Sequence, residues 1–310
     1  MSAIIERQDD VKQSSSWQVW WRLLRPHTLT AAFVPVLIGT MLALLHGEFH
    51  LLLFLAMLVA SLIIQMATNM FNEYYDYKRG LDTKESVGIG GTIVRDGVAP
   101  KVVLRLGFIL FFVALLIGVY ISATTSWWIA VVGAISMAAG YLYTGGPYPI
   151  AYTPYGEIVS GFFMGLVIIL ISFYIQTGTV SIESVLISVP ISILCGAILT
   201  SNNIRDREGD EKNGRRTLAI LLGHENSIKF LAWMFAVSYF WIVGMIVTGY
   251  GSPWLLLVFF SVPKAIQATN GFVGKTRPIE MMPAMKATAQ MHTFFGFLVS
   301  IGLFIEYILA

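Results

Sequence analysis

Nine apolar segments occupy most of this chain, and each is long enough to cross the hydrocarbon of a bilayer. Of the 310 residues, 56% are hydrophobic and 12% are charged, whereas soluble domains carry about 25% charged residues. In hydrocarbon the backbone polar groups must bond within each segment, so the segments are expected to be helices. We therefore predict an all-α membrane protein, a nine-transmembrane-helix bundle with spans at residues 28–46, 51–75, 103–122, 127–144, 156–176, 183–203, 228–248, 252–270 and 290–309.

Lys and Arg residues are confined to alternate connections between these segments. All 20 lie in the N-terminal region or in and beside the second, sixth and eighth connections, whereas odd-numbered connections such as 46–50 and 176–182 hold none. Because basic loops tend to stay on the cytoplasmic side, we expect a cytoplasmic N-terminus and an external C-terminus. The expected location is the plasma membrane, with the functional site at its cytoplasmic side.

The remaining features predict a single integral-membrane domain over residues 1–310. Residues 1–16 are polar and are expected to form a flexible tail, and the Trp- and Arg-containing segment 17–25 is typical of an interfacial amphipathic helix. Cys195 is the single cysteine, which excludes an internal disulfide and a thiolate metal site. The five histidines have no metal-ligand spacing, and no Ser-His-Asp arrangement or nucleic-acid-binding pattern is present.

A first polar cluster stands at the cytoplasmic end of the second predicted span. Its residues occupy positions i, i+3, i+4 and i+7, which places them along one side of a helix. Gly80 is expected to end that helix, and Asp82 follows in the connection. The cluster consists of Asn69, Asn72, Glu73 and Asp76.

A second cluster stands about 130 residues later, at the cytoplasmic end of the sixth span. Asn202, Asp206 and Asp210 occupy positions i, i+4 and i+8, although Gly209 is expected to break the last turn. One such cluster is equally consistent with a solvated helix end. Two clusters at the same membrane face indicate a functional site, and their oxygen ligands are those that Mg²⁺ prefers.

Basic and aromatic residues beside the clusters extend this interpretation. Arg and Lys side chains pair with the phosphate charge that Mg²⁺ does not neutralise. The alternative role of each nearby basic residue is to set the orientation of the chain in the membrane. The Gly-rich segment 88–97 contains Arg95, and such loops bring backbone N–H groups close to phosphate. The segment 141–155 is rich in Tyr, which suits either cation–π stabilisation of a carbocation or an interfacial aromatic belt. The basic candidates are Lys78, Arg79, Arg95, Arg205 and Arg207.

The combined pattern resembles the UbiA-type intramembrane aromatic prenyltransferases over nearly the whole chain. The resemblance rests on Asn72-x-x-x-Asp76, Asp206-x-x-x-Asp210, Gly214-x-x-Thr217-Leu218 and Leu24-Arg25-Pro26-x-Thr28-Leu29. Within the family, the first motif and its Gly-rich sequel are most similar to the MenA branch, which prenylates 1,4-dihydroxy-2-naphthoate. The sequence departs from the family at Glu73, where Asp is common, and at Gly80, where many relatives carry Asp.

The resemblance implies Mg²⁺-dependent transfer of a polyprenyl group from polyprenyl diphosphate to an aromatic acceptor. In the MenA branch the acceptor also loses its carboxylate as CO₂. The implied metal ligands are Asn72, Asp76, Asp82, Asp206 and Asp210. Whether Asp82 replaces the Asp that many relatives carry at the position of Gly80 stays open. The implied catalytic residues are Asp76, Asp206, Asp210, Arg95 and Tyr141. The implied substrate-binding residues are Arg25, Asn69, Asn72, Glu73, Lys78, Arg79, Asn202 and Arg205.

Three alternatives remain at this point. The first alternative is a member of another branch of the same family, whose acceptor is 4-hydroxybenzoate, homogentisate or haem. An ion-coupled transporter also uses paired carboxylates, but it places them near the bilayer midplane on broken helices, and here they lie beside basic loops. A CDP-alcohol phosphotransferase carries an Asp-Gly-x-x-Ala-Arg pattern that this sequence lacks.

Overall fold

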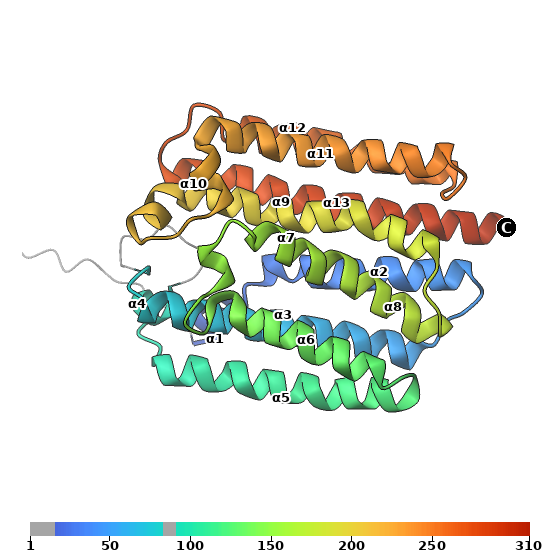
Figure 1. Ribbon diagram of the computed structural model, residues 1–310, viewed down its shortest axis with the longest axis horizontal. Helices are drawn as coiled ribbons and strands as arrows, with labels where there is room; N and C mark the ends of the chain where they lie inside the picture. Colours follow the sequence, from blue (N-terminus) through green and yellow to red (C-terminus); the bar gives the residue numbers. More distant parts are fainter. Residues whose placement is uncertain (1–15, 83–90) are drawn as a thin grey trace, which may run out of the picture.

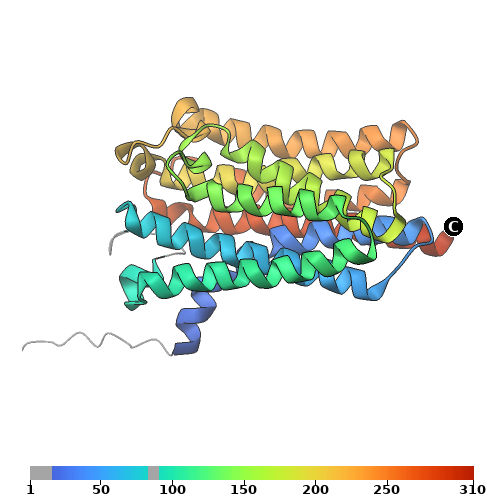
Figure 2. The same cartoon turned by 60° about the horizontal axis from the view of Figure 1, so that its bottom comes forward.

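The computed structural model describes residues 16–82 and 91–310, and its regular elements in these ranges are all helices. The predicted tail, apart from Ser16, and residues 88–90 of the Gly-rich segment lie outside the described residues. The long helices run side by side along one axis (Figures 1 and 2). The elements are α1 (Ser16–Leu24), η1 (Pro26–Thr28), α2 (Thr30–Leu45), α3 (Leu51–Lys78), α4 (Thr92–Asp96), α5 (Pro100–Thr124), α6 (Trp128–Thr144), η2 (Ile150–Tyr152), α7 (Gly156–Ser160), η3 (Gly161–Val167), α8 (Ile168–Thr177), α9 (Ile182–Lys212), α10 (Leu218–Leu222), α11 (His224–Val247), η4 (Pro253–Ser261), α12 (Val262–Asn270) and α13 (Pro278–Leu309).

The all-helical class is confirmed for the described residues. Six helical stretches are long and apolar enough to cross a membrane, namely α3, α5, the continuous stretch Gly156–Thr177, α9, α11 and α13. The three other predicted spans coincide with shorter or composite elements: α2 has 16 residues, α6 has 17, and residues 253–270 combine a 3₁₀ helix with an α-helix. The count of nine spans therefore stays a prediction.

Two helix ends beside the polar clusters can be compared directly with the sequence expectations. α3 ends at Lys78, and Gly80 follows with a φ of 74°, a left-handed conformation that suits glycine. The expected break at Gly209 was wrong, because α9 continues without interruption to Lys212. Asn202, Asp206 and Asp210 are therefore carried on one rigid helix.

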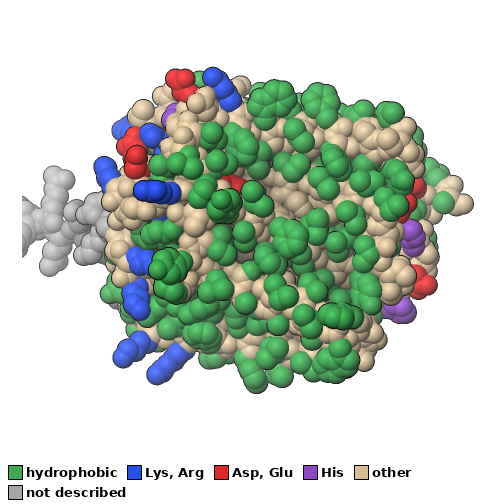
Figure 3. All heavy atoms as spheres, in the orientation of Figure 1, with side chains coloured by type: hydrophobic (Ala, Val, Ile, Leu, Met, Phe, Trp, Pro, Cys, Tyr) green, Lys and Arg blue, Asp and Glu red, His purple; other side chains and the backbone are tan. Residues whose placement is uncertain are grey.

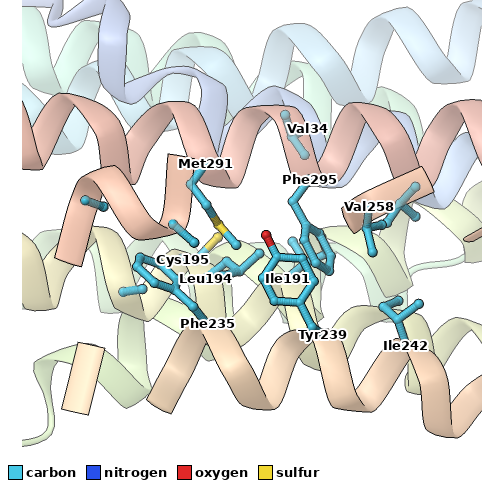
Figure 4. Packing of buried hydrophobic residues seen from close by; sticks show 14 of the residues in the cluster. Val34, Ile191, Leu194, Cys195, Phe235, Tyr239, Ile242, Val258, Met291 and Phe295 are labelled. Carbon is cyan, nitrogen blue, oxygen red and sulfur yellow. The ribbon is translucent and has the colours of Figure 1, made fainter. Parts of the chain in front are cut away.

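The main hydrophobic core lies between α9, α11, α13 and η4, with α2 packed against it. Figure 4 shows its centre, where Phe295 of α13 lies beside Tyr239 of α11 and Ile191 of α9. The Tyr239 hydroxyl is satisfied by Ser261, at 2.6 Å between the oxygens. Large apolar side chains such as Phe112 and Leu116 of α5 are exposed instead, as expected of surfaces that face lipid.

Charge is distributed along the bundle axis. On the face in Figure 3, the Lys and Arg side chains gather at the end that carries α4 and α10 in Figure 1, away from the C-terminus. α1 leaves the bundle at this same end (Figure 2). Trp17 and Trp21 on α1 stack on each other and are mostly exposed, and Arg22 pairs with Asp96 at 2.8 Å. These features fit the interfacial helix expected at residues 17–25.

Candidate active site

A pocket of about 1360 Å³ opens at the basic end of the bundle, between α3, α9 and α13. Both predicted polar clusters contribute to its wall, although they are far apart in sequence. The spacing of Asn72 and Asp76 on α3, and of Asn202, Asp206 and Asp210 on α9, turns these side chains toward a common space. Asp82, in the connection after α3, also lines the pocket.

Arg215 joins the two clusters across the pocket. Its guanidinium lies 2.7 Å from an Asp76 oxygen and 3.1 Å from an Asp210 oxygen, and it stacks over the ring of Tyr152. Gly214, with a φ of 77°, turns the chain back toward the pocket just before Arg215. Burial by itself would lower the pKa of Arg215, but the two carboxylates outweigh burial, and the pKa lies above its ordinary value. Arg215 therefore remains a cation.

From the sequence, Arg215 was only one of the 20 basic residues that predict the orientation in the membrane. The available signal was its position directly after Gly214, within the tail that follows the second motif. Tyr143, Asn203, Lys275 and Lys286 also line the pocket without having been predicted. Asn203 had the strongest signal of these four, because it follows Asn202 directly on α9.

The donor set of the pocket fits a divalent cation. Asp210 Oδ2 is buried and accepts no hydrogen bond from any described residue, so this oxygen still needs a partner. Burial, followed by the charges of Asp76 and Glu73, raises the pKa of Asp82 to about 6. Within residues 16–82 and 91–310, no three acidic, His or Cys side chains form a metal site by themselves. Mg²⁺ is commonly held by one or two carboxylates together with substrate phosphates, and this arrangement matches that need.

Six basic side chains line the same pocket and offset its acids. Arg205 binds both carboxylate oxygens of its neighbour Asp206 in a two-point pair, and it also reaches the sulfur of Met282. The Asp206 side chain stays 39% exposed, whereas that of Arg205 is 8% exposed. The basic lining can therefore receive an anionic ligand of high charge. It consists of Arg25, Arg205, Arg207, Arg215, Lys275 and Lys286.

Two residues of the first cluster lie outside the pocket lining and hold other parts of the chain. Glu73 is fully buried; it accepts hydrogen bonds from the backbone N–H of Gly91 (2.9 Å) and Ile93 (3.2 Å), and it pairs with Arg25 at 3.1 Å. Asn69 donates to the Leu24 carbonyl at 3.1 Å and to the Thr28 hydroxyl at 2.9 Å. Both side chains are thus held by these contacts, and their expected substrate contact stays a prediction.

Four further predicted site residues lie outside the lining as well. Arg79 donates to the Thr144 and Gly146 carbonyls and stacks on Tyr75. The Tyr141 hydroxyl lies 2.5 Å from that of Tyr75, and its ring packs on Phe71. Both residues are committed to helix packing. The other two, Lys78 and Arg95, are exposed.

We predict that Glu73→Gln destabilises the protein by about 2–4 kcal/mol, because the amide loses the Arg25 ion pair and turns an NH₂ group toward buried donors. The measurement is the unfolding temperature of purified protein in detergent. Glu48→Gln is the matched control, because Glu48 is exposed in the α2–α3 connection. Equal unfolding temperatures for the two variants would show that Glu73 does not hold this region together.

The chain is similar to known proteins over most of its length. The model of the UbiA prenyltransferase family matches residues 32–300. The chain is 60% identical to the 1,4-dihydroxy-2-naphthoate octaprenyltransferase of Bacillus subtilis over 97% of both chains. It is 26% identical to the Escherichia coli protein of the same name, over 95% of this chain and 98% of that protein.

Solved structures share the fold. A UbiA homologue from Archaeoglobus fulgidus, bound to DMAPP and Mg²⁺, superposes with a TM-score of 0.65 at 14% identity, over 91% of this chain and 99% of that one. A UbiA homologue from Aeropyrum pernix gives a TM-score of 0.65 at 17% identity, over 90% and 98% of the two chains. Together with the match over residues 32–300, these findings show that the chain belongs to the UbiA prenyltransferase family.

Proposed function

We propose that this chain transfers a polyprenyl group from polyprenyl diphosphate to 1,4-dihydroxy-2-naphthoate, with loss of CO₂ and diphosphate. The product is the reduced form of demethylmenaquinone, an intermediate of menaquinone biosynthesis. The observation that carries the proposal is the convergence of Asp76, Asp206 and Asp210 with six basic side chains in one pocket. The acceptor is supported by the 60% identity to the Bacillus subtilis octaprenyltransferase. Family membership sets aside the transporter and the CDP-alcohol phosphotransferase.

The reaction separates charge, and the pocket residues match that separation. The bond between C1 of the prenyl chain and the diphosphate oxygen breaks, and its electron pair leaves with diphosphate. The acceptor ring attacks the resulting allylic cation at the carbon that bears the carboxylate. The bond to that carboxylate then breaks, CO₂ departs, and its electrons restore the aromatic ring. Arg205, Arg207 and Lys275 line the pocket where they can hold the diphosphate negative charge.

The metal belongs to the same end of the pocket. Asp76, Asp206 and Asp210 would hold Mg²⁺, with Asn72 and Asp82 nearby. When bound, Mg²⁺ neutralises charge on the diphosphate and thereby makes it a better leaving group. Arg215 keeps Asp76 and Asp210 at a fixed separation. The partly buried Asp82 offers an additional oxygen.

The membrane location follows from the prenyl substrate. The pocket extends from the acidic residues along α9 and α13 to Leu199, Ala289 and Phe294. A polyprenyl chain is insoluble in water, so its tail needs an apolar surface while its diphosphate stays at the polar end. A helical bundle within a bilayer provides both environments.

The orientation proposal is a nine-span bundle in the plasma membrane with the pocket at the cytoplasmic side and the C-terminus external. Its support is the one-ended distribution of Lys and Arg. We expect single cysteines in a Cys195→Ala background to label from outside intact cells at position 48 and to label at position 212 only after the cells are opened. External labelling of position 212 would overturn the orientation.

The acceptor is tested with purified enzyme, a prenyl diphosphate and Mg²⁺. We expect kcat/KM for 1,4-dihydroxy-2-naphthoate to exceed that for 4-hydroxybenzoate or homogentisate by about 100-fold or more, because a hydrogen-bonding site discriminates strongly among polar substrates. Carboxyl-labelled dihydroxynaphthoate should release one CO₂ for each prenyl group transferred. Efficient prenylation of 4-hydroxybenzoate without turnover of the dihydroxynaphthoate would refute this acceptor assignment.

Metal dependence is tested with Asp210→Asn. We expect a loss of at least about 100-fold in kcat, together with weaker Mn²⁺ binding in electron paramagnetic resonance titrations. Glu211→Gln is the matched control: Glu211 is the adjacent acid on α9, it is exposed, and it lies outside the pocket lining. Full wild-type activity in excess EDTA would contradict the proposed role of Mg²⁺.

A further inference from the structure

A buried carboxylate stands behind the pocket wall, away from both acidic clusters. Glu157 is the second residue of α7 and is 5% exposed. Its Oε1 accepts a hydrogen bond from Asn203 Nδ2 at 2.8 Å. Its Oε2 is buried and has no hydrogen-bond partner among the described residues. A buried carboxylate is costly, so packing alone does not explain why Glu157 is buried here.

Glycines set the short distance between α9 and the helix that carries Glu157. A Cβ atom at Gly165 would lie 2.3 Å from Ser192 Cα, and one at Gly161 would lie 2.4 Å from the Ser192 carbonyl oxygen. A Cβ at Gly196 would lie 3.0 Å from the carbonyl oxygen of Glu157. The segment Gly161–Val167 is a π-helix, a distortion that is frequent at functional sites. The backbone here is thus adapted to bring Glu157 against Asn203.

The contact with Glu157 fixes the orientation of the Asn203 amide. Asn203 Nδ2 donates in this contact, so the amide NH₂ group faces Glu157 and leaves Oδ1 as an acceptor. Asn203 lines the pocket, and no described residue donates to its Oδ1. The Asn203 side chain therefore offers the pocket an uncharged hydrogen-bond acceptor.

Tyr143 lies on the same wall and between the two parts of the site. It lines the pocket, and its hydroxyl makes no hydrogen bond to a described residue. It interacts electrostatically with Glu157 and also with Asp76, Asp210 and Arg215. The wall formed by Asn203 and Tyr143 thus adjoins the acidic end, where the diphosphate would bind.

The two proposed substrates differ in what such a wall can bind. An ionised prenyl diphosphate has only acceptor oxygens, and an amide oxygen gives it no hydrogen bond. An aromatic acceptor with hydroxyl groups supplies O–H donors, and a tyrosine hydroxyl can both accept from and donate to them. The wall is therefore complementary to the hydroxylated ring.

We infer that Asn203 and Tyr143 bind a hydroxyl group of the aromatic acceptor and orient its ring toward the diphosphate end. Glu157 acts as a positioning residue that holds the Asn203 amide with Oδ1 toward the pocket. The inference rests on the proposed function in one respect: it requires the second substrate to be a hydroxylated aromatic acid.

The test combines Asn203→Leu with acceptor analogues that lack one hydroxyl. The analogues are 1-hydroxy-2-naphthoate and 4-hydroxy-2-naphthoate, measured as competitive inhibitors against 1,4-dihydroxy-2-naphthoate. In the wild type, removing the hydroxyl that Asn203 binds should weaken binding about tenfold. Asn203→Leu should weaken binding of the parent acceptor by the same factor of about ten. In this variant, removing the same hydroxyl from the ligand should change the affinity little. KM for prenyl diphosphate should stay within about twofold.

Independent, multiplicative losses from the variant and from each analogue would overturn the inference. So would a rise in KM for prenyl diphosphate without any rise for the acceptor. Asn226→Leu on α11 is the control for the same chemical change, because Asn226 is exposed and donates to the nearby Leu222 carbonyl at the end of α10. Unfolding temperatures in detergent show whether Asn203→Leu folds; if it does not, Asn203→Ala, which also removes the acceptor oxygen, is used in the same cycle and should also lose the hydroxyl preference.

The positioning role of Glu157 has its own pair of variants. Glu157→Gln retains a carbonyl oxygen that accepts from Asn203, so KM for the acceptor should stay within about twofold of the wild type. Glu157→Met removes that oxygen at similar length and should raise the acceptor KM about tenfold. Equal effects of the two variants would refute the positioning role.

An error in the proposed acceptor would give a result that differs from an error in the Asn203 inference. If the wild type ignores the dihydroxynaphthoate but prenylates 4-hydroxybenzoate, the same cycle with 4-hydroxybenzoate and benzoate still decides whether Asn203 binds the hydroxyl.

Discussion

Ionised side chains are costly in hydrocarbon unless they are paired, hydrated or close to the membrane surface, and this cost organises the whole chain. Three carboxylates near the pocket have cationic partners: Glu73 pairs with Arg25, and Asp76 and Asp210 share Arg215. The apolar helices pack around an apolar core, and their outer faces remain apolar. The chemistry is therefore concentrated at one end of the bundle, where acids and bases from distant parts of the sequence neutralise one another.

Helical periodicity and the distribution of basic residues together predicted the convergence of Asp76, Asp206 and Asp210. Periodicity places residues at i and i+4 on one helix face, and the basic connections place both helix ends at one side of the membrane. Periodicity was not sufficient to separate two adjacent stripes of α3. Asn69 and Glu73 form one stripe, and Asn72 and Asp76 form another that is rotated by about 60° around the axis. The first stripe faces the segments around Arg25 and Gly91, whereas the second faces the pocket. Which neighbour covers each stripe is decided by tertiary packing.

The same reasoning explains the choice between two nearby tyrosines. Tyr141 and Tyr143 are separated by about 200° on a helix, so only one of them can face the pocket. Tyr141 packs against Phe71 and Tyr75, and Tyr143 lines the pocket. Composition alone marked the whole segment 141–155 as a candidate. Arg215 was harder still to predict, because a loop side chain reaches its partners only through the turn at Gly214.

The two proposed ligands suit different parts of the pocket, because their hydrogen-bonding groups differ. Metal-binding oxygens and cationic side chains suit an anion that carries only acceptors, while the Asn203 oxygen and the Tyr143 hydroxyl suit a ring that carries donors. These groups stand on α3, α6 and α9; α3 packs against α6, and α9 packs against α11 and α13. A bimolecular reaction gains most when the reacting atoms are held about 3–3.5 Å apart. A wall for each ligand on rigid helices meets that requirement without demanding a separate closing motion.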